Sequence, residues 1–272
     1  MDPAMPLNGV EYILGIPVSN VGKESCIENI LQWIRDGVSG RSIVCANPHS
    51  IEIARVDPFF RDALTASDLV VPDGIGVVLA SRLLGGRIRG RITGSDIFHG
   101  LNSVLDREKR WSVFFLGSTE KTLTEIQRRF SIDYPGVRVA GILSPPFRSE
   151  FDEDENRTMV DIVNNARPDV LWVGMTAPKQ EKWIFRNRSK LLVKASIAIG
   201  AVFDFYAGNV QRSSPFFQHL GLEWLPRLIQ EPDRLWRRNL VSNPSFLVRV
   251  ICRKLLHARK ARNRQFRSRL GL

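Results

Sequence analysis

Short apolar segments alternate along this chain with amphipathic stretches. The apolar segments are residues 42–46, 68–72, 112–117, 137–142, 169–174 and 196–201. Apolar side chains recur at helical spacing in the stretches 50–65, 119–131, 155–166 and 178–190. Strands that are apolar throughout and are joined by helices are typical of a parallel sheet with both faces covered. We therefore predict an α/β fold with a mainly parallel sheet and helices on both of its faces.

The net charge of +11 is concentrated at the C-terminal end of the chain. Residues 224–272 contain 13 of the 39 Lys and Arg residues but only 2 of the 28 Asp and Glu residues. Residues 1–223 therefore contain 26 basic and 26 acidic residues. The C-terminal stretch also contains Trp224, Trp236 and many large aliphatic residues. A basic amphipathic helix with tryptophan is typical of a segment that lies at a membrane surface. We predict a neutral core at 1–223 and a basic amphipathic appendage at 224–272. We expect the appendage to bind an anionic membrane surface.

Three prolines are expected to divide the appendage into short helices, because proline interrupts helical hydrogen bonding. They are Pro226, Pro232 and Pro244. Two other interpretations of the appendage stay open. It could pack on the core as a helix with a solvated basic tail. It could also bind nucleic acid, although no nucleic-acid-binding motif accompanies the charge.

Several classes of protein are excluded by what the sequence lacks. No run of about 18 apolar residues is present, so we predict no transmembrane helix. The N-terminal residues lack the basic start of a signal peptide. Cys26, Cys45 and Cys252 are scattered and odd in number, which argues against a disulfide framework and against a cysteine zinc site. These features favour a reducing, cytoplasmic setting.

Neither the histidines nor the acidic residues predict a metal site. The 4 histidines are dispersed along the chain. Asp152-Glu153-Asp154 matches the DxD pattern that holds a divalent metal in many sugar-nucleotide enzymes, but it directly precedes a predicted helix. Carboxylates are expected in the first turn of a helix in any case. We favour this second explanation and predict no metal.

Polar residues follow several predicted strands, and ligands of parallel sheets bind beyond the carboxyl ends of the strands. Asp73 follows an apolar strand and precedes the glycines of Gly74-Ile75-Gly76. A partly desolvated carboxylate there would serve as a general base for a hydroxyl group; a turn or a helix cap is the alternative. The two glycines offer amides to a phosphate, but the third glycine of a dinucleotide motif and the lysine of a P-loop are missing.

Two further segments have features of anion binding. An arginine cluster precedes the cap-like sequence Thr93-Gly94-Ser95-Asp96, and its members are Arg87, Arg89 and Arg91. This cluster would meet a diphosphate or form a solvated loop. Lys179 follows Pro178 at a predicted helix start, where a cation is unfavourable unless an anionic ligand lies nearby.

Long motifs extend roughly from residue 40 to residue 240 in a fixed order. They are Asn47-Pro48, ASDLVVPDGIGVV (66–78), RITGSD (91–96), FFLGS (114–118), VGMTAPKQEKW (173–183), GAVFDFYAGNVQRSSP (200–215) and GLEWLPRLIQEPDRLWRR (221–238). Together they resemble the WecG/TagA/CpsF glycosyltransferases, also called glycosyltransferase family 26. Because several long motifs agree in register, this resemblance is far more specific than any single glycine motif.

The resemblance implies a Rossmann-like α/β enzyme that transfers a sugar from a UDP-sugar to a polyprenyl-diphosphate-linked saccharide. The implied reaction is inverting, uses no metal or other cofactor, and serves the synthesis of a cell-envelope polysaccharide or exopolysaccharide. Such an acceptor would place the enzyme peripherally on the inner, cytoplasmic face of the cell membrane. The apolar appendage leaves a homo-oligomer open, and nucleic acid is not expected as a partner.

The resemblance also implies roles for individual residues. Asp73 would be the catalytic base. Asn47 and Arg91 would line the pocket for donor and acceptor, while Gln180 and Asp204 would hold the nucleotide sugar. Arginines of the appendage would close over the site and bind the diphosphate, namely Arg227, Arg234 and Arg237.

Cys45 completes the predicted substrate-binding set. It stands two residues before Asn47, where the teichoic-acid branch of the family has a threonine, so the donor sugar stays open. Two other functional classes stay open as well. A nucleotide-dependent epimerase or oxidoreductase would fit the alternation of strands and helices. Such an enzyme is expected to have a complete glycine motif followed by an acidic residue, which this sequence does not show. A nucleic-acid-binding protein would rest on the basic appendage alone.

Overall fold

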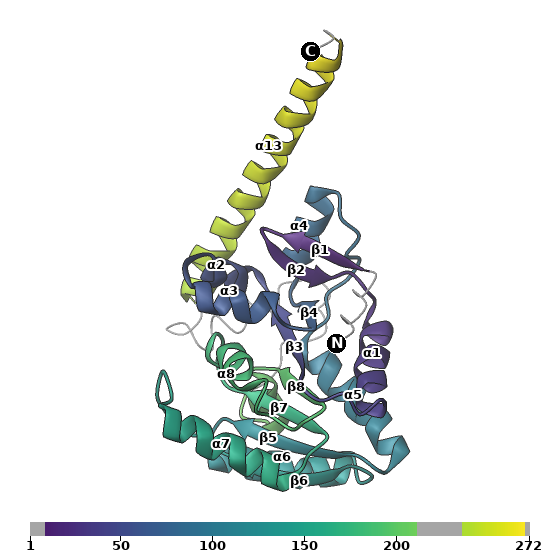
Figure 1. The fold of residues 1–272 in the computed structure, drawn as a ribbon, viewed down its shortest axis with the longest axis vertical. Helices are drawn as coiled ribbons and strands as arrows, with labels where there is room; N and C mark the ends of the chain where they lie inside the picture. Colours follow the sequence, from purple (N-terminus) through teal and green to yellow (C-terminus); the bar gives the residue numbers. More distant parts are fainter. Residues whose placement is uncertain (1–8, 211–235, 270–272) are drawn as a thin grey trace.

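The computed structural model describes residues 9–210 and 236–269, with the backbone alone at 237, 238 and 257–269. A six-stranded sheet lies at its centre, with the strand order β4-β3-β8-β7-β5-β6 and parallel pairing throughout (Figure 1). The strands are β3 (Arg41–Ala46), β4 (Leu69–Pro72), β5 (Ser112–Gly117), β6 (Arg138–Leu143), β7 (Val170–Gly174) and β8 (Ala195–Ala198). Each predicted apolar segment corresponds to one of these strands, so the predicted α/β fold is confirmed.

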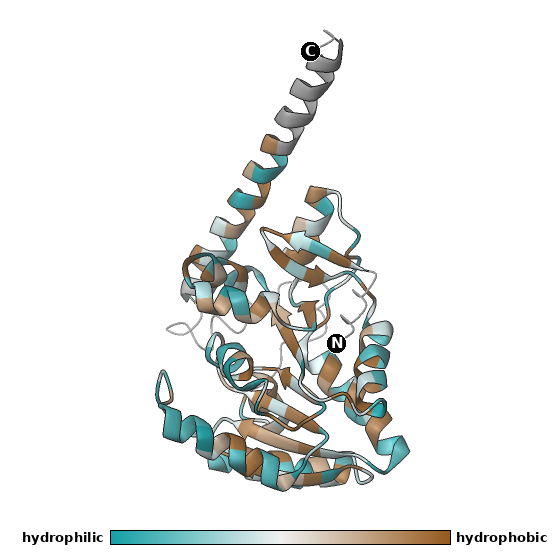
Figure 2. Ribbon diagram, in the orientation of Figure 1, coloured by the Kyte–Doolittle hydropathy of each residue, from teal (hydrophilic) through white to brown (hydrophobic). Residues whose placement is uncertain are grey.

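Alternate residues of the strands enter two separate apolar cores, one on each face of the sheet. In β5, Phe114 and Leu116 belong to the first core, and Val113 and Phe115 belong to the second. The first core is covered by α2 (Pro48–Val56), α3 (Pro58–Thr65), α4 (Ile75–Leu84), α7 (Glu153–Ala166) and α8 (Lys179–Asn187). The second is covered by α1 (Lys23–Arg35), α5 (Gly94–Glu108), α6 (Glu120–Asp133) and α9 (Val202–Ala207). Burial on both faces explains why the strands are mainly apolar, as the brown colour of much of the sheet in Figure 2 shows.

The helix predicted at 50–65 is wrong as a single element. The structure divides it into α2 and α3 at Asp57, whose backbone is extended (φ −119°, ψ 95°). Pro58 causes the break, because a proline disfavours helical geometry in the residue before it. The Asp57 side chain then caps α3 by accepting a hydrogen bond from the backbone N–H of Phe60 (3.0 Å).

Some elements were not predicted, because their patterns are short or lack polar faces. The antiparallel hairpin of β1 (Val10–Ile13) and β2 (Ile16–Ser19) has strands of 4 residues each. Ile13, Ile16 and Val18 of this hairpin nevertheless lie in the first core. The α4 segment is apolar on most of its faces, and such a segment shows little helical periodicity.

The C-terminal region differs from the predicted series of short helices. A π-helical segment, η1 (Arg237–Ser242), leads directly into one helix of 27 residues, α13 (Asn243–Arg269). Pro244 therefore lies inside a continuous helical segment, directly after the wider π turn, and does not divide it. Pro226 and Pro232 lie outside the described residues.

The start of α13 is anchored to the body of the molecule, and the remainder projects from it (Figure 1). Phe246 and Val250 are buried in the first core, where α13 packs on α2 and α4. Arg249 adds an ion pair with Glu52 of α2 (3.2 Å). Beyond this anchor, apolar and polar residues alternate in patches along the helix in Figure 2. Within the described residues, no helix has the length and apolarity needed to cross a bilayer.

Candidate functional site

A cavity of about 480 Å³ lies at the carboxyl ends of β3, β4, β7 and β8. Side chains from the start of α13 form part of its wall. The cavity brings together most of the predicted site residues, namely Cys45, Asn47, Asp73, Arg91, Gln180 and Asp204. Arg227 and Arg234 lie outside the described residues, and Arg237 is described by its backbone alone.

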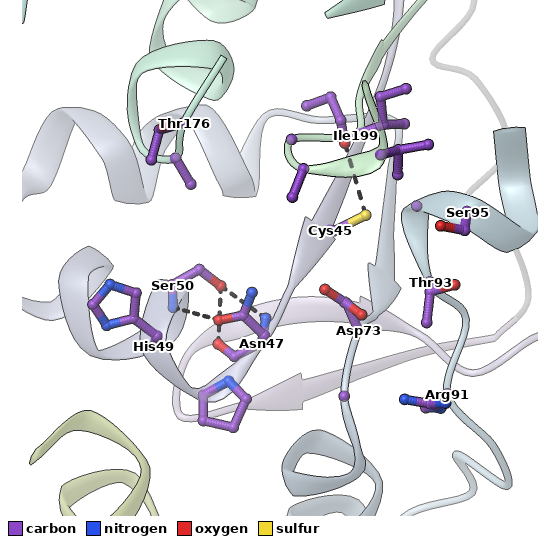
Figure 3. Close-up of a pocket in the computed structure, with 18 of the residues that line it drawn as sticks. Cys45, Asn47, His49, Ser50, Asp73, Arg91, Thr93, Ser95, Thr176 and Ile199 are labelled. Atoms are coloured by element: carbon purple, nitrogen blue, oxygen red, sulfur yellow. Dashed lines mark hydrogen bonds between the residues drawn. The ribbon is translucent and has the colours of Figure 1, made fainter. Parts of the chain in front are cut away.

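Asn47 follows β3 and caps α2. Its side-chain oxygen accepts a hydrogen bond from the backbone N–H of Ser50 (3.0 Å), and the Ser50 hydroxyl accepts one from the backbone N–H of Asn47 (2.8 Å) (Figure 3). Pro48 fits the first helical position, since no N–H is needed there. The cap uses the carbonyl part of the Asn47 side chain, so its NH₂ group is the part available to a ligand in the cavity.

Asp73 lies at the end of β4, where its backbone N–H donates to the carbonyl of Ala46 (2.8 Å). Its carboxyl is half-buried and lies between Asn47 and Arg91 in Figure 3. Gly74 has a φ of 95°, which favours glycine where the chain turns into α4. A Cβ at Gly76 would lie 2.5 Å from the ring of Pro48, so a glycine there lets the starts of α2 and α4 approach each other.

Arg91 and Thr93 reach the cavity from the loop before α5. The backbone N–H of Ile92 donates to the carbonyl of Pro72 (2.8 Å), which ties this loop to the end of β4. The Thr93 hydroxyl accepts a hydrogen bond from the backbone N–H of Asp96 (3.2 Å), and the Asp96 carboxylate accepts one from the backbone N–H of Thr93 (2.9 Å). The predicted cap is therefore confirmed, and it holds Thr93 at the cavity.

Gln180 and Glu181 are buried in the first turn of α8. The Gln180 Oε1 atom accepts a hydrogen bond from the backbone N–H of Gly200 (3.1 Å), and its Nε2 atom donates to Oε1 of Glu181 (2.8 Å). Because both ends of the Gln180 amide are bonded, its orientation is fixed. Burial raises the pKa of Glu181 to about 7.

Cys45 lines the cavity together with Asp73 and Glu181. Its Sγ atom donates to the carbonyl of Ala198 at 3.7 Å. Burial, followed by the charges of Asp73 and Glu181, raises the pKa of the thiol well above its usual value. The thiol of Cys45 therefore stays neutral.

The starts of four helices meet at this cavity: α2, α4, α5 and α8 each contribute first-turn residues to its wall. A helix N-terminus offers unpaired amides and a partial positive charge, and therefore favours anions. With Arg91 beside them, these helix starts suit a ligand that carries phosphate groups. The site thus combines a carboxyl group with an environment that favours anions.

Comparison with known proteins identifies the family. The sequence profile of the Glycosyl transferase WecG/TagA/CpsF family matches residues 11–260 of the chain. The chain belongs to this family. As a member of it, the protein is a glycosyltransferase, which sets aside the interpretations as an epimerase, an oxidoreductase or a nucleic-acid-binding protein.

Relatives of this WecG/TagA/CpsF member include bacterial enzymes named N-acetylglucosaminyldiphosphoundecaprenol N-acetyl-beta-D-mannosaminyltransferase. The Bacillus spizizenii enzyme is 34% identical over 216 residues, which are 79% of this chain and 80% of the relative. The Bacillus subtilis enzyme is 33% identical over 242 residues, 89% of this chain and 91% of the relative. An enzyme of Staphylococcus aureus is 26% identical over 239 residues.

The cavity of this family member also contains residues that the sequence analysis did not single out. Glu181 directly follows Gln180 in the motif VGMTAPKQEKW (173–183), so the sequence contained an indication that it belongs to the site. Asn239 and Asn243 come from the segment around η1 and the start of α13, and tertiary packing alone brings them to the cavity. His49 belongs to the same wall, and its Nδ1 atom lies 2.8 Å from the Ser242 hydroxyl.

Some residues singled out for anion or metal binding lie elsewhere. The Lys179 ammonium donates to the backbone carbonyl of Arg148 (3.0 Å) and lies over the Phe151 ring, so it does not line the cavity. The cavity wall includes Arg91 but neither Arg87 nor Arg89.

The acidic run before α7 has the structural role that the sequence analysis favoured. Asp152 caps α7 by accepting a hydrogen bond from the backbone N–H of Glu155 (2.8 Å). Asp154 pairs with Arg157 on the next turn (2.7 Å). Over the part of the chain that the structure describes, no group of three or more His, Cys, Asp or Glu side chains could hold a metal ion.

Proposed function

We propose that this glycosyltransferase moves a sugar from a UDP-sugar to a polyprenyl-diphosphate-linked saccharide, with inversion at the anomeric carbon and without a metal. The names of the relatives support the acceptor, because they specify N-acetylglucosamine on an undecaprenyl diphosphate. The donor sugar in those names is N-acetylmannosamine. For this chain we propose an N-acetylhexosamine of the same class.

The observation that carries the proposal is the position of Asp73, half-buried in a cavity whose wall is built from helix N-termini. In the proposed step, the Asp73 carboxylate takes the proton from an acceptor hydroxyl group. The hydroxyl oxygen forms a bond to the anomeric carbon from the face opposite the leaving group. The bond between that carbon and the β-phosphate oxygen breaks, and UDP leaves with the electron pair.

Stabilisation of the leaving diphosphate is assigned to fixed positive charge. Arg91 and the amides at the starts of α4, α5 and α8 surround the cavity, and such preorganised donors stabilise developing negative charge without reorganisation. We assign the diphosphate contacts from the appendage to Arg227, Arg234 and Arg237. Gln180 and Asp204 are proposed to hold the nucleotide sugar.

The surface of α13 supports an acceptor that lies in a membrane. Ile251 and Leu255 are exposed one helical turn apart, and Leu247 begins the same stripe at the cavity wall. Arg253 and Lys254 are exposed on the same helix. A basic helix with an exposed apolar stripe binds the surface of anionic membranes. We propose that the chain divides functionally into a transferase core at 1–223 and a membrane-associated appendage at 224–272.

A donor screen tests the proposed function. Purified full-length protein is supplied with a short-chain prenyl-diphosphate N-acetylglucosamine and with a panel of UDP-sugars, and UDP release is followed. We expect release with one UDP-N-acetylhexosamine, unchanged by EDTA, and a product of inverted anomeric configuration by NMR. No acceptor-dependent release with any UDP-sugar would reject the proposal, and loss of release in EDTA would reject its metal-independent part.

A further inference from the structure

A structural role in capping α8 does not explain why a glutamate stands at position 181. Glu181 is the third residue of the helix, where a glutamate ordinarily reaches back to the backbone N–H of the capping residue. The capping residue of α8 is Pro178, which has no N–H. In α7, by contrast, Glu155 at the same helical position accepts a hydrogen bond from the backbone N–H of Asp152 (3.1 Å). Glu181 therefore lacks the partner that its position normally supplies.

The two oxygen atoms of the Glu181 carboxyl group have different surroundings. Oε1 accepts the hydrogen bond from the Gln180 amide, whereas Oε2 has no hydrogen-bond partner among the described residues. The residue is 3% exposed and lines the cavity. Burying an unpaired carboxylate oxygen is unfavourable, and residues kept in this condition are concentrated at binding and catalytic sites.

The residues around Glu181 indicate which kind of ligand group its Oε2 atom would bind. Asp73, Glu181 and Cys45 all line this one cavity. A carboxylate repels phosphate and accepts hydrogen bonds from hydroxyl groups. The group that Oε2 suits is therefore a sugar hydroxyl close to the reacting centre rather than the diphosphate.

We propose that Glu181 is a substrate-binding residue: its Oε2 atom accepts a hydrogen bond from a hydroxyl group of the UDP-sugar, while Oε1 orients the Gln180 amide. This inference rests on the proposed function, since it takes a UDP-sugar as the ligand. The hydroxyl group belongs to the transferred sugar or to the ribose, and the two sources are separable by experiment. The presence of Asp73 in the same cavity favours the transferred sugar.

The test compares the full-length wild-type protein with Glu181→Gln at pH 8, using calorimetric titration with UDP-N-acetylmannosamine and with UDP. Glutamine keeps the acceptor for Gln180 but replaces the free oxygen with an NH₂ group. We expect the Kd for the UDP-sugar to rise roughly tenfold or more. An unchanged Kd for UDP assigns the hydroxyl to the transferred sugar, and an equal rise for UDP assigns it to the ribose.

Thermal unfolding of the same proteins separates binding from a structural role. A residue that serves the fold destabilises the protein when it is replaced. Removal of a buried charge that serves ligand binding stabilises the unliganded protein instead. We therefore expect Glu181→Gln to melt at a higher temperature than the wild type at pH 8. Glu155→Gln is the matched control, and it should melt slightly lower while binding the UDP-sugar as the wild type does.

A second variant keeps the test decisive if Glu181→Gln does not fold. Glu181→Met has a similar volume and removes both oxygen atoms, so it should bind the UDP-sugar more weakly still. Equal affinities of the wild type and a folded variant for the UDP-sugar, or a lower melting temperature of Glu181→Gln, would overturn the role of Glu181. Failure of the wild type to bind any uridine nucleotide would instead overturn the proposed function on which this role rests.

Discussion

At the scale of single residues, Asn47 serves the fold and the cavity with different atoms. Its side-chain oxygen caps α2, and its NH₂ group is left for the cavity. A polar residue after a strand can therefore cap a helix and bind a ligand at the same time, and the two interpretations do not exclude each other. Asp73 is the opposite case, because its backbone N–H joins the sheet while its carboxyl group lies at the cavity.

Two substitutions separate the tasks of Asn47. Asn47→Asp keeps an oxygen for the cap, so its stability should remain close to that of the wild type. Asn47→Ala removes the cap and should lower the free energy of unfolding by about 1 kcal/mol. Both variants lose the NH₂ group and should lose most of their transfer activity. Urea unfolding and UDP release check this, and full activity in Asn47→Asp would show that the amide does not bind substrate.

Replacement of Asp73 tests the assigned base. Asp73→Asn keeps the size of the side chain but removes its basicity, so turnover should fall by roughly 10² to 10⁴-fold. Affinity for the UDP-sugar should change little, because the base acts on the acceptor hydroxyl group. Asp62→Asn, on the exposed face of α3, is the control. Wild-type turnover by Asp73→Asn would show that another group takes the proton.

The buried Glu181 predicts how stability depends on pH. Its pKa is about 7 in the folded protein against an ordinary value of 4.5, so the folded state retains a proton that the unfolded state has released between these values. Stability conferred by this group is therefore lost as the pH rises from 4.5 to 7, by on the order of 3 kcal/mol.

Besides Glu181, the groups whose charges act on the Cys45 thiol are Asp73, Cys26 and Asp96, and all of them are common to the wild type and Glu181→Gln. The difference between the two proteins isolates the titration of Glu181. We expect urea unfolding to show the wild type losing stability relative to the variant over this pH range. A constant difference from pH 4.5 to 8 would contradict the raised pKa.

At the scale of elements, α13 combines two kinds of contact along one helix. Its first turns are held by the buried Phe246 and Val250 and by the pairing of Arg249 with Glu52. Because Arg249 is engaged with α2, it is not among the charges left for a membrane. The part of α13 that follows carries the exposed apolar residues Ile251, Leu255 and Leu256. A helix held at one end in this way presents its free part in a defined direction.

The exposed stripe of α13 can be tested without disturbing the cavity. Ile251→Glu combined with Leu255→Glu should weaken binding to anionic vesicles by roughly tenfold or more, because two apolar contacts with lipid are replaced by charges that repel it. Binding of UDP should be unchanged. Leu192→Glu is the control, because Leu192 is more exposed than either residue and lies just before β8, away from α13. Vesicle flotation measures the effect, and undiminished flotation of the double variant would exclude this stripe as the membrane contact.

At the scale of the whole molecule, the sequence predicted what depends on local pattern and missed what depends on packing. The strands were recognised because burial on both sheet faces requires continuous apolar runs, as in β5 and β7. Asp73 was found because the strand-end rule applies to parallel sheets. Asn243 could not be found, since a helix from the far end of the chain brings it to the cavity. Glu181 was missed because a charged residue in a first helical turn is ordinary until its burial is known.

A truncated chain separates the anchor of α13 from the basic tail. A protein that ends at Leu256 retains Phe246 and Val250, so it should unfold at the same temperature as the full chain and bind UDP equally well. It lacks Arg259, Lys260, Arg262, Arg264, Arg267 and Arg269. Each basic residue near an anionic surface contributes about 1 kcal/mol, so vesicle affinity should fall by several orders of magnitude. Unaltered vesicle affinity would place the membrane contact elsewhere.

The length of α13 limits how the enzyme is oriented on lipid. From Leu247 at the cavity wall to the last turn at Arg269, the helix rises by about 33 Å. If this helix stood upright with its tip in the headgroups, the proposed base Asp73 would lie far from a sugar that a diphosphate tethers to the lipid. If α13 binds lipid as proposed, we therefore expect it to lie along the plane of the bilayer, with the mouth of the cavity turned toward the lipid.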